Sequence, residues 1–356
     1  MGKEAANRET ANSPVMAFLA RAWPVLVLVV PLLLAVVLAD LYGSVLLRRT
    51  MTEALIKIVI VVGLYIFIGN TGIVSFGHIG FAGIAAYVTT WMTCCAMMKP
   101  ITMTGLPDFL RLETYPVGLA VLASVAAAGL AALIIGLVLM RLSGLAASIS
   151  TLAALFIFHA VYANWDSVTM GRASIVGIPT VVTLWLGLGG AVLAILVAYL
   201  YQISPWGLTA RAARDDEVAA QAAGISLYWN RLVPFVISGM VVGLGGVMQV
   251  HFMGTVSINA FYLNLTFLTL AMLVVGGMRS LGGAVVGVVV LSTIADMFRR
   301  LEAGVDLAGT RIATPIGTQE MFLAALMLLI LIFRKDGLMG RHELRLPRFL
   351  TRARQG

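Results

Sequence analysis

Long apolar runs recur along this 356-residue chain and constrain its fold more than any other feature. Many are about 17 to 25 residues long, the length that a helix needs to cross the hydrocarbon core of a bilayer. Hydrophobic residues make up 60% of the chain and charged residues 11%, so a soluble fold could not bury this much apolar surface. The sequence therefore predicts an all-α integral membrane protein with about ten transmembrane helices, at residues 23–40, 53–69, 76–98, 116–140, 143–163, 179–203, 231–253, 260–277, 282–298 and 318–333.

The distribution of basic residues orients these spans. An even number of spans places both termini on one side, and Lys and Arg are enriched on the cytoplasmic side of membrane proteins. Fifteen of the 24 Lys and Arg residues fall on the segments that face the same side as the termini, eight fall on the opposite side, and Lys57 lies within a span. Both termini are therefore expected in the cytoplasm, and orientation accounts for most of the net charge of +8 without a nucleic-acid partner.

This reading divides the chain into three parts. We expect a cytoplasmic N-terminal tail over residues 1–22 and, after an uncleaved first span, a transmembrane domain over 23–333. A basic cytoplasmic tail over 334–356 follows, suited to contact with anionic lipid. Cys94 and Cys95 are adjacent in an apolar stretch, so we expect two small packed side chains and no disulfide framework or zinc site.

The long inner loop at residues 204–230 carries a candidate helix. Pro205 and Gly207 mark a break, the stretch from Leu208 to Ala223 is rich in helix formers, and Gly224 is placed to end it. Its apolar positions recur at helical spacing beside charged ones, which suits either a solvated connector or an element that docks in a groove of a partner protein.

A second polar cluster interrupts the apolar pattern between residues 69 and 83. Asn70, Thr71, Ser75 and His78 alternate there with glycines such as Gly77, a composition typical of an interrupted helix beside a polar path. The four histidines show no metal-ligand spacing, so no metal site is expected. No G-x-x-x-x-G-K-[ST] phosphate loop is present, so any ATP hydrolysis must occur on another chain.

Five segments, in order along the chain, resemble the permeases of bacterial ABC importers, in particular the LivM-type branch that carries branched-chain amino acids. The inner loop contains Glu217-Val218-Ala219-Ala220-Gln221-Ala222-Ala223-Gly224, which is similar to the family's coupling motif E-x-A-A-x-x-x-G. The other matching segments are 63–87, 164–171 with 177–179, 276–283 and 333–338. The outer loop reads Thr169-Met170-Gly171-Arg172 where the family usually shows a second glycine, and this departure leaves the solute open.

The resemblance implies a type II ABC-importer-like permease in the bacterial inner membrane, with no catalytic activity and no cofactor of its own. It implies a paralogous LivH-type permease, two ABC ATPase subunits that bind ATP and Mg, and a periplasmic or lipid-anchored solute-binding protein. Residues implied to contact the ATPase are Arg211, Arg214, Asp215, Glu217, Ala219, Ala220 and Gly224. Asn70, Thr71, Ser75, Gly77 and His78 are expected on the translocation path, and Asp166, Thr169 and Arg172 on the loop that faces the binding protein.

Alternatives to amino-acid import stay open. The same architecture could import urea, short amides or small organic acids. An ion-coupled carrier acting alone would need ionisable residues deep within spans, and Lys57 is almost the only one. An intramembrane enzyme would need a polar catalytic set near one face of the bilayer, and the sequence offers none.

Overall fold

The computed structural model describes residues 14–303, 305–307, 310–312, 315, 317–334 and 337–340. Most of the two expected tails, residues 1–13, 335–336 and 341–356, lies outside this part of the chain. The first helix begins at Pro14, before the predicted start of the first span.

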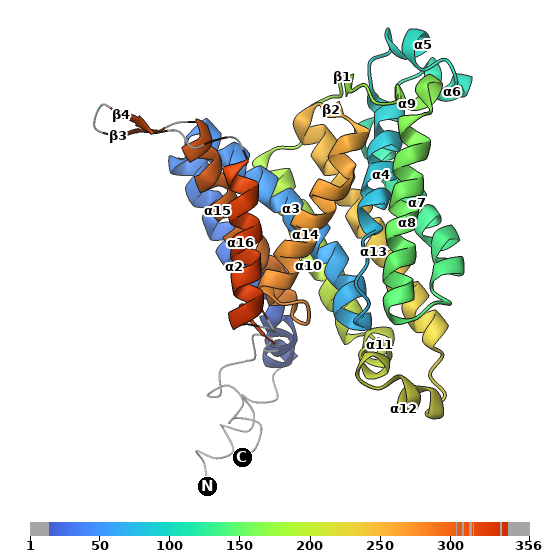
Figure 1. Ribbon diagram of the computed structural model, residues 1–356, viewed down its shortest axis with the longest axis vertical. Coiled ribbons are helices and arrows are strands. Elements are labelled where there is room, and N and C mark those ends of the chain that lie inside the picture. The colour runs from blue at the N-terminus through green and yellow to red at the C-terminus, as the bar shows by residue number, and fades with distance from the viewer. Residues whose placement is uncertain are drawn as a thin grey trace.

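The described chain is a bundle of long helices, with short elements at both of its ends (Figure 1). The helices at least 14 residues long are α2 (Pro14–Tyr42), α3 (Val45–Thr71), α4 (His78–Thr93), α7 (Val117–Leu139), α8 (Gly144–Ala163), α10 (Leu184–Ile203), α13 (Leu227–Met253), α14 (Leu263–Gly276), α15 (Leu281–Ala303) and α16 (Thr318–Phe333). The shorter elements are α5 (Lys99–Thr102), α6 (Asp108–Arg111), α9 (Asp166–Thr169), α11 (Pro205–Asp215), α12 (Glu217–Ala222), the 3₁₀ helix η1 (Ile258–Phe261) and strands β1 (Ile175–Val176), β2 (Thr255–Val256), β3 (Val305–Leu307) and β4 (Thr310–Ile312).

The all-α membrane architecture predicted from the apolar runs is confirmed. Within the described residues, eight helices are long and apolar enough to span a bilayer, with η1 and α14 counted together as 258–276. The other two predicted spans correspond to α4 and α16, which have 16 residues each and are shorter than a full crossing requires. Helix α4 is shorter than its predicted span of 76–98 because the chain is not helical before His78 or after Thr93.

The two ends of the bundle differ. We call the end that carries α11 and α12 the α12 end, and the end that carries α5, α6, α9 and the β1–β2 pair the β1 end (Figure 1). In the β1–β2 pair, Ile175 lies opposite Val256 and Val176 opposite Thr255, so the loop before α10 is joined to the end of α13. Strands β3 and β4 form a second antiparallel pair between α15 and α16.

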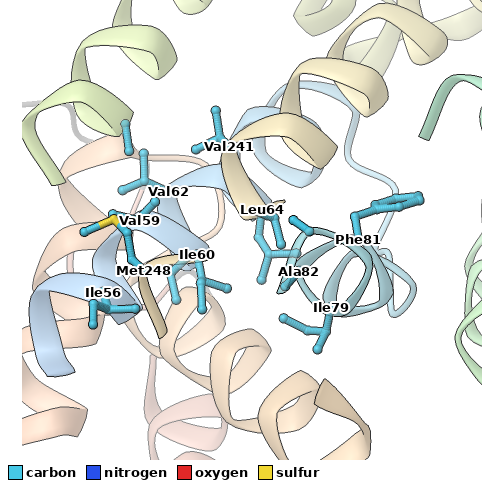
Figure 2. Packing of buried hydrophobic residues seen from close by; sticks show 14 of the residues in the cluster. Ile56, Val59, Ile60, Val62, Leu64, Ile79, Phe81, Ala82, Val241 and Met248 are labelled. Carbon is cyan, nitrogen blue, oxygen red and sulfur yellow. The ribbon is translucent and has the colours of Figure 1, made fainter. Parts of the chain in front are cut away.

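Helices α3 and α13 form the centre of the bundle. α13 packs against α3, α4 and α7, and α3 also packs against α10 and α15. Figure 2 shows Val59 and Leu64 of α3 beside Met248 of α13 and Ala82 of α4, with no polar side chain among the residues drawn. Small residues allow the close approach: a Cβ on Gly246 of α13 would overlap the backbone carbonyl of Ala82.

The two cysteines correct one prediction. Cys94 and Cys95 are joined to one another in a disulfide at the β1 end of α4. Cys94 is buried, as expected for a small packed residue, whereas Cys95 is partly exposed. The pairing is possible because Cys94 is the residue at which the chain leaves the helix for an extended conformation.

Candidate functional site

The loop at residues 204–230 folds into two helices, where the sequence predicted one. Ser204 accepts a hydrogen bond of 3.2 Å from the Gly207 N–H and begins α11. Asp216 then breaks the helical run, because its side chain accepts hydrogen bonds of 2.9 Å from the N–H groups of Val218 and Ala219 and so caps α12. Gly224 takes a φ of +81° just after α12 and ends it, as the sequence predicted.

Helix α12 presents a mixed surface at its tip. Glu217, Val218 and Ala219 are exposed, whereas Ala220 is buried against the rest of the loop. The Val218 side chain is 77% exposed, so an apolar side chain stands free at the α12 end. Burial of such an exposed apolar side chain in an apolar pocket of another protein contributes favourable free energy to binding.

Arg231 of α13 ties α12 to the bundle. Its guanidinium forms an ion pair of 2.6 Å with Glu217 and donates a second hydrogen bond of 3.2 Å to the Leu142 carbonyl in the α7–α8 connection. The arginine side chain is 9% exposed and the glutamate side chain 49%. Together with Met140, Ser143, Gln221 and Tyr228, these residues line a groove of about 840 Å³ that opens at the α12 end.

Arg211 and Arg214 point toward their own chain. Arg211 donates a hydrogen bond of 2.7 Å to the Gln202 carbonyl at the end of α10. Arg214 donates one of 2.5 Å to the Gly69 carbonyl in the last turn of α3, and it also pairs with Asp215 at 3.2 Å. The sequence predicted that both arginines contact a partner. In the structure both bond within the chain, and Asp215, Asp216 and Glu217 are exposed.

The last turn of α3 brings four of the sequence motifs together. A Cβ on Gly69 would lie 2.9 Å from the Met278 carbonyl in the α14–α15 connection, and the Gly69 carbonyl accepts the bond from Arg214. Leu338 and Met339 donate hydrogen bonds of 2.8 and 3.1 Å to the carbonyls of Val275 and Gly276. Parts of the segments 63–87, 214–225, 276–283 and 333–338 therefore meet at the α12 end, although they are well separated in sequence.

Most of the predicted path residues lie inside the bundle. Asn70, Ser75, Gly77 and His78 are buried, and only Thr71 is partly exposed. Residues 72–77 separate α3 from α4, so the polar cluster does lie at a helix break. The His78 ring lies 2.7 Å from the Ser75 hydroxyl and packs against Phe67, Phe81 and Phe235.

Three residues at the β1 end were predicted to face the binding protein, and the structure buries one of them and exposes two. Thr169 is buried and its hydroxyl donates to the carbonyls of Tyr162 and Trp165. Asp166 and Arg172 are exposed on either side of it. Met170 has a φ of +59°, a conformation that glycine adopts more easily, and it stands within the stretch that departs from the family pattern.

Lys99 supports this loop, and no sequence motif identified it. Its ammonium group is fully buried and donates to the carbonyls of Trp91, Leu110 and Glu113 at 2.9, 2.9 and 2.7 Å. Burial lowers the pKa of Lys99 below its usual value. Trp91 in turn donates from its indole nitrogen to the Val168 carbonyl, so α4, the α5–α6 segment and α9 form one connected cap.

Lys57 lies within α3 but is paired. Its ammonium group contacts the Glu53 carboxylate at 2.7 Å, and the same glutamate contacts Arg299 of α15 at 3.4 Å. This arrangement is a structural ion pair near the β1 end. In the part of the chain that the structure describes, no three His, Cys, Asp or Glu side chains are grouped as metal ligands.

Comparison with known proteins places the chain in a family. Residues 46–331 match the family described as "Branched-chain amino acid transport system / permease component". The high-affinity branched-chain amino acid transport system permease protein LivM of Escherichia coli (strain K12) is 27% identical over 153 residues, which are 42% of this chain and 33% of that protein. LivM of Salmonella typhimurium (strain LT2) is 28% identical over 144 residues, 40% of this chain and 31% of that protein. The matches thus span about a third of these relatives' length, and no solved structure matches the chain.

Proposed function

Because the chain belongs to the family of permease components of branched-chain amino acid transport systems, we propose that it forms half of the translocation path of an ATP-driven importer. The solute that we propose is a branched-chain or related neutral amino acid, taken up by alternating access. The observation that carries the proposal is the exposed helix α12: Arg231 connects it to α13, and Arg214 of the preceding α11 connects the same loop to α3.

We place the α12 end in the cytoplasm. Arg141, Arg211, Arg214, Arg231, Arg279 and Arg334 lie in the loops and helix ends on that side. Ten passes of the chain would return both termini to this side, and the excess of arginine there supports the same orientation. The β1 end would then face outward, in the bacterial inner membrane, toward a binding protein that delivers the solute.

The free energy of ATP hydrolysis would reach this chain through α12. We propose that α12 docks on one of two ABC ATPase subunits, which close when they bind ATP and Mg and open again after hydrolysis. A movement of α12 would pull on Arg231 and Arg214, and so displace the ends of α13 and α3 that meet at the α12 end. A second permease, paralogous to this one, would complete the path.

Reconstitution tests this proposal. The complete set of chains consists of this permease, the second permease, the two ATPase subunits and the binding protein. In proteoliposomes it should take up radiolabelled leucine only with ATP, and this chain alone should take up none. Uptake by the chain alone, driven by an ion gradient, would show instead an ion-coupled carrier. ATP-driven uptake of urea, short amides or organic acids without leucine would overturn the choice of solute.

A further inference from the structure

A small group of exposed and partly exposed polar side chains lies near the β1 end of the bundle. It consists of His159 of α8, Asn259 of η1, and Tyr262 and Asn264 at the start of α14, which we call the α8–α14 surface. Asn259 and Asn264 are exposed, and His159 and Tyr262 are partly exposed. None of these residues belongs to the site described above.

The group is organised by direct contacts between two helices and a 3₁₀ turn. The His159 Nε2 atom lies 3.1 Å from the Asn259 Oδ1 atom, and the His159 ring stacks on the Tyr262 ring with the two centroids 3.8 Å apart. Phe156 approaches Tyr262 to 5.9 Å between centroids. The His159 imidazole, the Asn259 amide and the aromatic rings therefore share one surface, and the exposed Asn264 follows two residues after Tyr262.

This surface lies near the β1 ends of its membrane-spanning helices, with His159 four residues, or about 6 Å, before the end of α8 at Ala163. Helix α14 has 14 residues and is about 21 Å long, shorter than a hydrocarbon core of about 30 Å. Its other end, at Gly276, already lies in the cluster of motifs at the α12 end. Helix α14 is therefore too short to span the core by itself, and η1 before it completes the apolar span 258–276 at the β1 end.

Polar side chains at this depth are costly against lipid, and they mark a water-filled path in membrane proteins. Besides Phe156, which contacts Tyr262, the large exposed side chains of α8 are all apolar, as on a lipid-facing surface: Leu145, Ile149, Ile157 and Val161. His159 departs from that pattern where α8 meets η1. We therefore expect Ile157 to contact lipid. We expect His159 to contact water or a polar solute.

We propose that the α8–α14 surface lines the outer part of the solute path, where the second permease of the importer would close it from the other side. This proposal rests on the proposed function and assigns the path to residues other than Asn70, Ser75, Gly77 and His78, which are buried. Imidazole and amide N–H groups suit a carboxylate, amide oxygens suit an ammonium group, and the aromatic rings suit an aliphatic side chain. Since no carboxylate, Lys or Arg belongs to the surface, it favours a zwitterion of no net charge over an ion.

Cysteine accessibility tests the assignment without relying on transport. In the complete transporter, with Cys94→Ser and Cys95→Ser as background, His159→Cys and Asn264→Cys are treated from the outside with a positively charged, membrane-impermeant methanethiosulfonate. Ile157→Cys on α8 is the matched control. It lies two residues, or about 200° around the helix, from His159 and is 65% exposed. Labelling after denaturation verifies that each thiol is present and each chain inserted.

We expect both test cysteines to react at least tenfold faster than the control, in the nucleotide-free or the vanadate-trapped transporter. Reaction no faster than the control in both states would overturn the assignment and indicate lipid or a sealed subunit contact. The experiment distinguishes failure of one proposal from failure of the other. ATP-driven leucine uptake without labelling would refute only the assignment of the α8–α14 surface to the path. Labelling in a transporter that takes up no amino acid would refute the proposed function and would still show that the surface is exposed to water.

Discussion

The guanidinium of Arg214 donates a hydrogen bond of 2.5 Å to the backbone carbonyl of Gly69. This carbonyl belongs to the last turn of α3, where the helix has no following turn to satisfy its acceptors. The arginine stem also covers Gly72, the residue that ends α3 with a φ of +75°. Arg214 thus joins the loop of α11 and α12 to the helix break before α4, which is where a movement of the loop would first reach the bundle.

Arg214→Ala should uncouple ATP hydrolysis from uptake. The variant loses a charge-assisted hydrogen bond of a kind that contributes about 1.5–3 kcal/mol, so leucine uptake should fall roughly tenfold or more while ATP hydrolysis continues. Arg214→Lys keeps the charge and part of the stem and should retain intermediate uptake. The measurement is the ratio of leucine transported to ATP hydrolysed in proteoliposomes. An unchanged ratio in Arg214→Ala would remove this contact from the coupling route.

Glu217→Lys should abolish ATP-dependent uptake and leave membrane insertion intact. The substitution places two cations side by side at the partly buried Arg231, where the native pair is 2.6 Å apart. Glu217→Gln keeps a hydrogen-bond acceptor and should reduce uptake less. Normal uptake by the Glu217→Lys variant, at equal amounts of protein in the membrane, would refute the assignment of coupling to this loop.

Val218→Asp should release the ATPase without affecting the fold. Because the side chain is 77% exposed, the substitution should change the free energy of unfolding by no more than about 0.5 kcal/mol. The matched control is Val176→Asp, an exposed valine at the β1 end. Co-purification of the ATPase subunits should be lost in the first variant and kept in the second. Equal retention of the ATPase in both would show that the tip of α12 is not the docking surface.

The sequence reveals the bundle better than it reveals the details of the loops. Runs of apolar residues predict where helices cross the membrane, since lipid leaves the backbone few alternatives to a helix. The break at Asp216 was not predicted, because aspartate is tolerated within a polar helix and caps one only where the chain turns. The inward direction of Arg214 depends on Gly69, which is 145 residues away in sequence.

Two further features could be identified only from the folded structure. Lys99 reads in the sequence as a basic residue of an outer loop, and only folding brings three carbonyls to its ammonium group. The α8–α14 surface combines His159 with Asn259, 100 residues apart, so no local pattern could indicate it. By contrast, the Gly224 helix end was predictable because the requirement for a positive φ is local.

Lys99→Met should loosen the cap at the β1 end. Methionine fills a similar volume but donates no hydrogen bond, so three partly buried carbonyls lose their shared donor. Leaving buried acceptors unsatisfied costs about 1–3 kcal/mol. The variant should show faster proteolysis within residues 94–116 in detergent, whereas Lys57→Met, at the Glu53 pair, should leave that loop protected. Equal protection of the loop in native protein and in Lys99→Met would show that the ammonium group does not hold the cap.

Gly246→Ala should destabilise the centre of the bundle. A Cβ at this position of α13 would lie 2.7 Å from the carbonyl carbon of Ala82, so α4 and α13 would have to move apart. Overpacking of this kind costs about 1–3 kcal/mol, and the obstacle is backbone that cannot rotate away. Gly189→Ala is the matched control, because nothing lies within 4 Å of its Cβ on α10 and alanine favours the helix by up to about 1 kcal/mol. Thermal unfolding in detergent should shift to lower temperature for the first variant and stay unchanged or rise for the second. Equal unfolding temperatures for Gly246→Ala and native protein would mean that α4 and α13 are further apart than the structure places them.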